Sequence, residues 1–100
     1  MMTTQENIEA VSKAAELFKA LGSPVRLAIL WKLSERPSTV NELAELLDVS
    51  QPLMSQHLRV LRQHKLVNST VNGQYHTYQL ADEHVSHIVG DAIEHTREKS

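Results

Sequence analysis

The C-terminal stretch of the sequence carries side chains that bind metal ions, spaced as Asp-x-His, ten residues, then His-x-x-Glu. The four side chains in this pattern are Asp82, His84, His95 and Glu98. Imidazole nitrogens and carboxylate oxygens both bind zinc, at about 2.0–2.2 Å. The pattern after Asp82 is typical of a helix, with Gly90 its only helix-weakening residue. At about 100° per residue, one arc of about 80° holds His84, His87, Asp91, His95 and Glu98.

The spacing decides how these side chains can meet. His84 and His95 lie about 16 Å apart along one helix, so one helix cannot bring both to one ion. Two antiparallel copies related by a two-fold axis can, with Asp82 and His84 of one chain facing His95 and Glu98 of the other. Gly90 falls near the centre of that pairing, where a glycine allows close backbone approach. The sequence therefore predicts a homodimer with two shared metal sites. The alternative is a polar helix face with scattered histidines, the better interpretation for any single His.

Composition narrows the class of protein. We expect residues 1–100 to form one domain with a modest core, which a dimer interface would supplement. The absence of cysteine excludes disulfides, thiolate metal sites and thiol redox sensing. No apolar run is long enough to cross a bilayer, and no signal segment is recognisable. We therefore expect a cytosolic protein with no membrane partner.

Charge is distributed unevenly along the chain. The formal net charge is −2, yet residues 49–81 contain no Asp or Glu. The potentially cationic side chains of this segment are Arg59, Arg62, Lys65, His57, His64 and His76. An acid-free segment in an acidic chain is a local footprint for phosphate, although three formal charges make it a weak signal by itself.

Hydrophobic periodicity predicts a mainly helical chain. The expected helices cover residues 7–21, 25–34, 40–47, 51–64 and the tail after Asp82. Residues 1–6 are expected to be irregular, and residues 36–38 to form a loop. Ser23 is expected to cap the second helix, and Thr39 with Glu42 matches a capping box for the third. The third helix is expected to turn Leu43, Leu46 and Leu47 inward.

The helices at 40–47 and 51–64 are joined by a tight turn and form a helix-turn-helix. Ser50 is expected to cap the second, Pro52 fits its first turn, and Met54, Leu58 and Leu61 face inward. In such motifs the second helix enters the DNA major groove, where Gln pairs with adenine, Arg with guanine, and Ser with bases or phosphate. The candidate DNA-binding residues are Ser50, Gln51, Ser55, Gln56, Arg59 and Arg62.

A β-hairpin is expected directly after the helix-turn-helix. Residues 66–71 and 74–80 favour strands, and Asn72-Gly73 between them is typical of a two-residue turn. A helix-turn-helix followed by a hairpin is a winged helix, so the fold class is mainly α with a β-hairpin wing. The wing tip has no Arg or Lys, and His76 is the only nearby residue that can become cationic, so weak wing contacts are expected.

At this point the chain resembles a known family, the arsenical-repressor/metallothionein-repressor (ArsR/SmtB) metal-sensing winged-helix proteins. The resemblance covers residues 7–98 and rests on three stretches: Leu-Phe-Lys-Ala-Leu-Gly-Ser-Pro-Val-Arg at 17–26, Val-Ser-Gln-Pro-Leu-Met-Ser-Gln-His-Leu at 49–58, and the tail at 82–98. The tail is similar to that of the zinc-sensing branch. The resemblance implies that Asp82, His84, His95 and Glu98 bind zinc. It also implies that Gln51, Ser55 and Gln56 recognise bases and that Arg59 contacts phosphate.

The resemblance also implies a mode of action. Family members are homodimers joined by the first and last helices, the metal-free form binds an inverted repeat in double-stranded operator DNA, and metal releases efflux or sequestration genes from repression. Three features depart from the pattern. The helix near Val40 lacks the cysteines of arsenic, cadmium and lead sensors, Pro52 replaces a small polar residue, and His87 is an extra donor. Nickel and cobalt sensors of the family carry a His-rich extension, which this sequence does not show.

Two alternatives remain open. A winged-helix regulator that senses nickel or cobalt, or no metal, would use the tail as another site or only as a dimer clasp. A zinc hydrolase would need three protein ligands, an open water position and a nearby base. Here the fourth position is filled and no nucleophile motif is present, so we expect no enzymatic activity and no small organic substrate.

Overall fold

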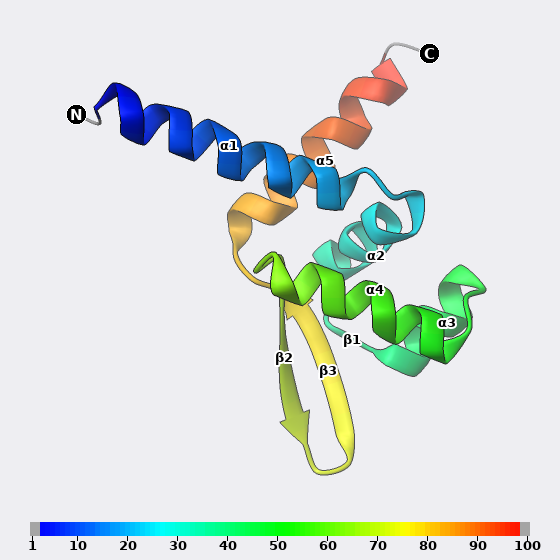
Figure 1. The fold of residues 1–100 in the computed structure, drawn as a ribbon. Helices are drawn as coiled ribbons and strands as arrows, with labels where there is room; N and C mark the ends of the chain where they lie inside the picture. The colour runs from blue at the N-terminus through cyan, green and yellow to red at the C-terminus, as the bar shows by residue number, and fades with distance from the viewer. Residues whose placement is uncertain (1–2, 99–100) are drawn as a thin grey trace.

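A computed structural model describes residues 3–98 of the chain (Figure 1). The elements in order are α1 Thr4–Leu21, α2 Pro24–Glu35, β1 Ser38–Thr39, α3 Val40–Leu47, α4 Gln51–Gln63, β2 Val67–Asn72, β3 Tyr75–Leu80 and α5 Glu83–Glu98. The expected winged helix-turn-helix is confirmed, with α3 and α4 as its helices and β2–β3 as its wing. In Figure 1 the wing projects from the end of the molecule opposite α1 and α5. No helix among residues 3–98 is both long enough and apolar enough to span a membrane.

Short polar side chains fix where the helices begin. Ser23 Oγ accepts a hydrogen bond from the Arg26 amide at 3.2 Å, as expected. The capping box of α3 is complete, because Thr39 Oγ1 accepts from the Glu42 amide while Glu42 Oε1 accepts from the Thr39 amide. The start of α1 was predicted too late: the helix begins at Thr4 rather than at residue 7, because Thr3 caps it. Residues 1 and 2 lie outside the described part of the chain.

The sheet has three antiparallel strands in the order β1-β3-β2. The loop expected at residues 36–38 was partly wrong, since Ser38 pairs with Tyr78 and Thr39 with Thr77. The hairpin turn lies one residue later than predicted. Asn72 pairs with Tyr75, which leaves Gly73 and Gln74 as the turn. Gly73 has a φ of 66°, which suits the first position of a type II′ turn, where glycine is favoured.

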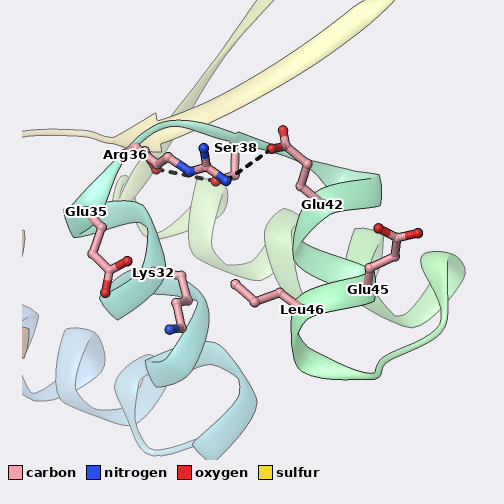
Figure 2. Close-up of a pocket in the computed structure, with 7 residues that line it drawn as sticks. All are labelled: Lys32, Glu35, Arg36, Ser38, Glu42, Glu45 and Leu46. Carbon is pink, nitrogen blue, oxygen red and sulfur yellow. Dashed lines mark hydrogen bonds and ion pairs between the residues drawn. The ribbon is translucent and has the colours of Figure 1, made fainter.

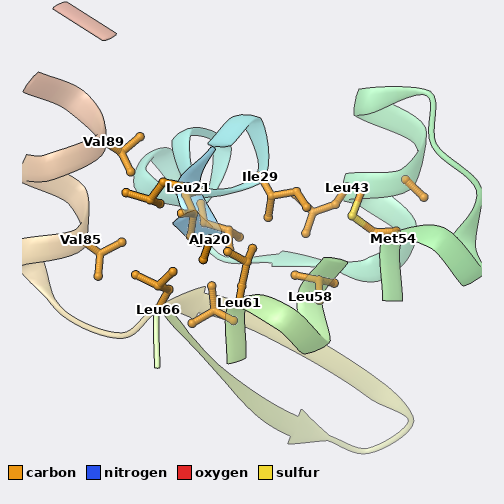
Figure 3. Packing of buried hydrophobic residues seen from close by; sticks show 14 residues of the cluster. Ala20, Leu21, Ile29, Leu43, Met54, Leu58, Leu61, Leu66, Val85 and Val89 are labelled. Carbon is orange, nitrogen blue, oxygen red and sulfur yellow. The ribbon is translucent and has the colours of Figure 1, made fainter. Parts of the chain in front are cut away.

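One hydrophobic core joins the DNA-binding motif to the last helix (Figure 3). Met54, Leu58 and Leu61 of α4 are buried, as expected. Val85 and Val89 of α5 are buried in the same cluster. The other members of this core are Ala20, Leu21, Ile29, Leu30, Leu33, Leu43, Ala44, Leu66 and Val67. Both α4 and α5 therefore pack against α2.

Two apolar faces remain open on the single chain. Ile8, Val11 and Phe18 of α1 are large hydrophobic side chains that are exposed. Leu46 was predicted to point inward but is 58% exposed. It lies at the rim of a hollow between α2 and α3, where the neighbouring Leu43 takes the buried position. The periodicity of α3 identified its apolar side but not which leucine the core covers.

Leu58→Ala and Leu46→Ala form a matched pair that tests this assignment. Because Leu58 is 1% exposed, its truncation should lower the free energy of unfolding by about 2–4 kcal/mol. Leu46→Ala should change it by no more than about 0.5 kcal/mol. Urea denaturation at one protomer concentration, followed by the emission of Trp31, measures both. Equal losses for the two variants would contradict the structure.

Candidate functional site

The outer surface of α4 carries the side chains predicted to contact DNA. Ser50 caps the helix by accepting from the Leu53 amide at 3.3 Å. The predicted contact residues, all exposed, are Ser50, Gln51, Ser55, Gln56, Arg59 and Arg62. The buried face of α4 holds the helix against the core, so this polar face points away from it. The structure thus presents every predicted contact residue on one helix, and their roles in binding DNA stay predictions.

A hollow of about 620 Å³ separates the start of α4 from the wing. Gln51 and Ser55 of α4 line one side, and Tyr75 and His76 of β3 line the other. Tyr75 is 62% exposed and was not singled out from the sequence, where it counted only as a strand former. The available signal was its place next to the hairpin turn, where an aromatic side chain is far from the core.

Arg26 lies at the corner between α1 and α2, close to His57 of α4. Its Nε donates a hydrogen bond to the Ala20 carbonyl at 2.7 Å, which ties the end of α1 to the start of α2. Partial burial, and secondly the positive charge of Arg26, lower the pKa of His57 on α4 below the ordinary His value. His57 is therefore favoured as a neutral side chain at the joint between α4 and this corner.

The C-terminal helix has an apolar stripe beside the donor arc that the sequence predicted. Val85 and Val89 are buried, and Ile88 and Ile93 are half-buried against the core. Ala92 is exposed. The potential metal ligands, all exposed, are Asp82, His84, His87, His95 and Glu98. The donor stripe therefore remains open to solvent along its whole length.

Asp82 has a structural role in addition to its proposed one. Its Oδ1 accepts a hydrogen bond from the Val85 amide at 3.2 Å, which satisfies a free donor at the start of α5. This hydrogen bond uses one of the two carboxylate oxygens. The cap fixes the backbone beside His84, so two donors at this end are held on a defined turn.

A single chain offers two half-sites rather than one complete metal site. Within residues 3–98 no three His, Asp or Glu side chains approach closely enough to hold one ion. Asp82 and His84 lie at the first turn of α5, and His95 and Glu98 at its last turns. The shared site between two protomers stays a prediction. The donor set of two imidazoles and two carboxylates suits tetrahedral zinc once the two ends are brought together.

A second hollow, of about 570 Å³, lies between α2 and α3. It is lined by Lys32, Glu35, Arg36, Ser38, Glu42, Glu45 and Leu46 (Figure 2). Its three carboxylates point in different directions in Figure 2, and Glu42 is paired with Arg36 at 3.6 Å. Hydrogen bonds from Thr39 are the main cause that lowers the pKa of Glu42. Glu42 of this hollow therefore serves the α3 cap, and α3 has no cysteine.

The last turns of α5 also contact α2. The Arg97 guanidinium carbon lies 5.2 Å from the centre of the Trp31 ring, and Arg97 Nη1 pairs with Glu94 at 3.9 Å. Lys32 Nζ lies 5.6 Å from the same ring. Trp31 is half-buried, and its ring contacts the turn of α5 that carries His95 and Glu98 through Arg97.

Comparison with known proteins places this geometry among transcription regulators. A family model described as a helix-turn-helix domain matches residues 21–70. The chain is similar to the HTH-type transcriptional repressor SmtB of Mycobacterium tuberculosis, with 44% identity over 90% of this chain and 67% of that protein. It is also similar to the HTH-type transcriptional regulator KmtR of Mycobacterium tuberculosis, with 39% identity over 85% of this chain and 65% of that protein.

A solved structure shows the same fold. Reduced HlyU from Vibrio cholerae superposes with a TM-score of 0.80 and 36% identity, over 86% of this chain and 90% of that one. The chain spans about two thirds of the length of the two curated relatives above and most of this neighbour.

The neutral His57 predicts a pH dependence of stability. Because folding lowers the pKa of His57, its contribution is present above the ordinary His pKa of about 6.5 and is lost as pH falls through the lower folded value. Wild type should therefore lose more free energy of unfolding between about pH 7.5 and about pH 5.5 than His57→Gln does. Denaturant titrations at both pH values measure the difference.

His64→Gln is the matched control, since His64 is exposed at the end of α4. It should keep the wild-type pH dependence. An unchanged pH dependence in His57→Gln would show that His57 is not held neutral by the fold.

Proposed function

Because the chain belongs to the ArsR/SmtB family of winged helix-turn-helix transcriptional regulators, we propose that it is a zinc-responsive repressor. The family is one of DNA-binding regulators and not of enzymes. The observation that carries the zinc proposal is the placement of two donor pairs at opposite ends of one exposed helix face. Asp82 and His84 occupy one end, and His95 and Glu98 the other.

In the proposed complex, α4 enters the major groove of double-stranded operator DNA. Gln51, Ser55 and Gln56 contact base edges, and Arg59 with Arg62 contacts phosphates. Support comes from the exposure of all five side chains and from the acid-free segment around them. The operator would be an inverted repeat, because a two-fold dimer presents two α4 helices to two half-sites.

The dimer would form through α1 and α5. The apolar side chains Ile8, Val11 and Phe18 of α1 are exposed on the single chain, and a second copy would cover them. Residue 90, near the middle of α5, is a glycine, and a Cβ added there would meet no neighbouring atom within 4 Å. A partner helix can therefore approach α5 closely at this point.

Asp82 and His84 of one protomer would bind zinc together with His95 and Glu98 of the partner. Zinc bound in this way would supply a tetrahedral clamp that fixes the two α5 helices in one relative orientation. The α5 helices are packed on the same core as α4, so their orientation sets the separation of the two α4 helices. Repression is relieved if the clamped arrangement no longer matches successive major grooves. Reciprocity then requires DNA to weaken zinc binding by the same factor.

The contact between Arg97 and Trp31 provides a direct route for this coupling. Arg97 is flanked by the proposed ligands His95 and Glu98, and Trp31 belongs to α2, on which α4 packs. A shift of the last turns of α5 would therefore be transmitted to α2 through the contact of the Arg97 guanidinium with Trp31. Cation–π contacts contribute about 0.5–1 kcal/mol at exposed sites, which is enough to bias the two arrangements.

A different metal is the second candidate, and His87 is the observation that favours it. His87 is exposed on the donor face of α5, between the two half-sites. A further nitrogen ligand would suit nickel or cobalt, which accept more ligands than tetrahedral zinc. A regulator that responds to no metal would use the same face only as a dimer clasp.

Zinc should release the protein from its operator, and ligand substitution should abolish the release. Fluorescence anisotropy of a labelled operator duplex, titrated with zinc and then with chelator, measures this directly. Wild type should dissociate reversibly, whereas His95→Ala should stay bound at zinc concentrations about 100-fold higher. Asp82→Asn should behave like His95→Ala while keeping α5 capped, because Asn caps helices as well as Asp does.

Asp91→Asn is the matched control for these variants. Asp91 lies on the same face of α5 but outside the four proposed ligands, so this variant should release DNA like wild type. Tight DNA binding that ignores zinc in the wild type would refute the zinc proposal, and release by nickel or cobalt alone would support the second candidate.

Arg97→Gln should separate zinc binding from the response of the DNA-binding helices. Zinc should still bind to His95 and Glu98, but the ratio of operator affinities without and with zinc should fall by about twofold to fivefold. The emission of Trp31, the only tryptophan of the chain, should lose its response to zinc.

Lys32→Gln is the control for this variant, because Lys32 contacts the same ring from within α2. It should alter the emission of Trp31 but leave the affinity ratio unchanged. Equal affinity ratios in wild type and Arg97→Gln would show that the coupling does not pass through this contact.

A further inference from the structure

The first turn of α4 is apolar on the side that faces away from the core. Leu53 is 44% exposed, although it is a large hydrophobic side chain on an otherwise polar surface. Pro52, next to it, is exposed as well. The other exposed side chains of the helix are polar, namely Gln63 and the Gln, Ser and Arg residues assigned above to DNA. Pro52 therefore lies among the proposed DNA-contact residues, and Leu53 lies at their edge, next to Gln56. These two residues are called here the α4 apolar patch.

This end of α4 is also poor in hydrogen-bond donors. Free amides at a helix N-terminus commonly bind phosphate. Here Pro52 has no N–H, and the Leu53 amide donates to Ser50 Oγ at 3.3 Å. The Met54 amide donates to the Ser50 carbonyl at 2.8 Å. Of the first four amides of α4, only that of Gln51 is left for a phosphate, so this turn is suited to an apolar group of the DNA.

The position of the α4 apolar patch predicts which group of the DNA it would contact. At about 100° per residue, Pro52 and Leu53 lie about 40° and 60° to either side of Gln56 around the helix axis. Residues at the N-terminal end of a recognition helix reach the base edges. Gln56 is the side chain that would pair with adenine there, so the patch would touch base edges next to that adenine. The one apolar group that the major groove exposes is the C5 methyl of thymine.

We propose that the α4 apolar patch recognises a thymine methyl group in each half of the operator, beside the base contacted by Gln56. This inference rests on the proposed function, since it requires α4 to lie in the major groove. It assigns Pro52 and Leu53 as specificity-determining residues, in addition to the polar contacts. Burial of one methyl against the patch accounts for about a threefold to fivefold preference for thymine in each half-site.

The test removes single methyl groups from the DNA. The full-length chain, kept free of metal with chelator, first selects its preferred duplex from a random pool. Each thymine of that duplex is then replaced in turn by deoxyuridine, which lacks only the C5 methyl. At one position in each half-site this replacement should weaken wild-type binding by about threefold to fivefold. The other positions should show no change of this size.

Substitutions in the protein then identify the side chain that senses the methyl. Leu53→Ala should bind the thymine and deoxyuridine duplexes equally at that position. Pro52→Ala should reduce the preference, and it carries the test alone if circular dichroism shows that Leu53→Ala is unfolded. Leu46→Ala is the matched control, since Leu46 is an exposed leucine on α3, outside the DNA-binding surface. It should keep the full wild-type preference.

The outcomes separate this inference from the function on which it rests. Selective binding together with a methyl preference that Leu53→Ala removes supports it. Selective binding with no sensitive thymine, or with a sensitivity that both patch variants retain, overturns it and leaves the regulator assignment standing. Failure to select any duplex would overturn both.

Discussion

The arrangement of this protein depends on one shared hydrophobic core. Val85 and Val89 of α5 are buried in the same cluster as Leu58 and Leu61 of α4, against the buried face of α2. Protein interiors are packed as densely as organic crystals, so elements fastened to one core move together and not independently. In the proposed mechanism, this core would couple α5, which carries the potential metal ligands, to α4, which carries the predicted DNA contacts. Neither the donors of α5 nor the polar face of α4 needs to touch the other for the two to be coupled.

The rise of the α-helix then dictates how many chains a metal site requires. Donors eleven residues apart lie about 16 Å apart along α5, which is several times the span of a coordination sphere. Within the described part of one chain, no three donors gather around one point, even though α5 exposes all of them. A metal site shared between protomers predicts how the two chains are arranged, whereas a site within one chain does not. In the proposed dimer, zinc occupancy and protomer orientation therefore cannot vary separately.

Local chemistry was predictable from the sequence, and long-range pairing was not. Ser23, Thr39 and Ser50 were each predicted as caps and each accepts the expected hydrogen bond, because a cap depends on residues within one turn. Strand β1 was missed, because two residues have no periodicity and Ser38 becomes a strand residue only by pairing with Tyr78. The exposure of Leu46 was missed for a related reason, since helical spacing does not show which residue its neighbours cover. The donors on α5 were found by spacing, but a single chain cannot display the site that they would complete.

A weakly charged DNA-binding surface suits a repressor that must dissociate from its operator. If Arg59, Arg62 and Lys65 all contact phosphate, a dimer neutralises six charges, and the logarithm of its affinity should fall about 5 units per tenfold rise in salt. Such affinity is modest for each half-site, so tight binding relies on both α4 helices engaging at once, with the second contact made effectively intramolecular by the first. That advantage disappears when the two half-sites cannot be occupied together. In the proposed mechanism, a change in protomer orientation that leaves every individual contact intact would therefore suffice for release, without unfolding or blocking α4.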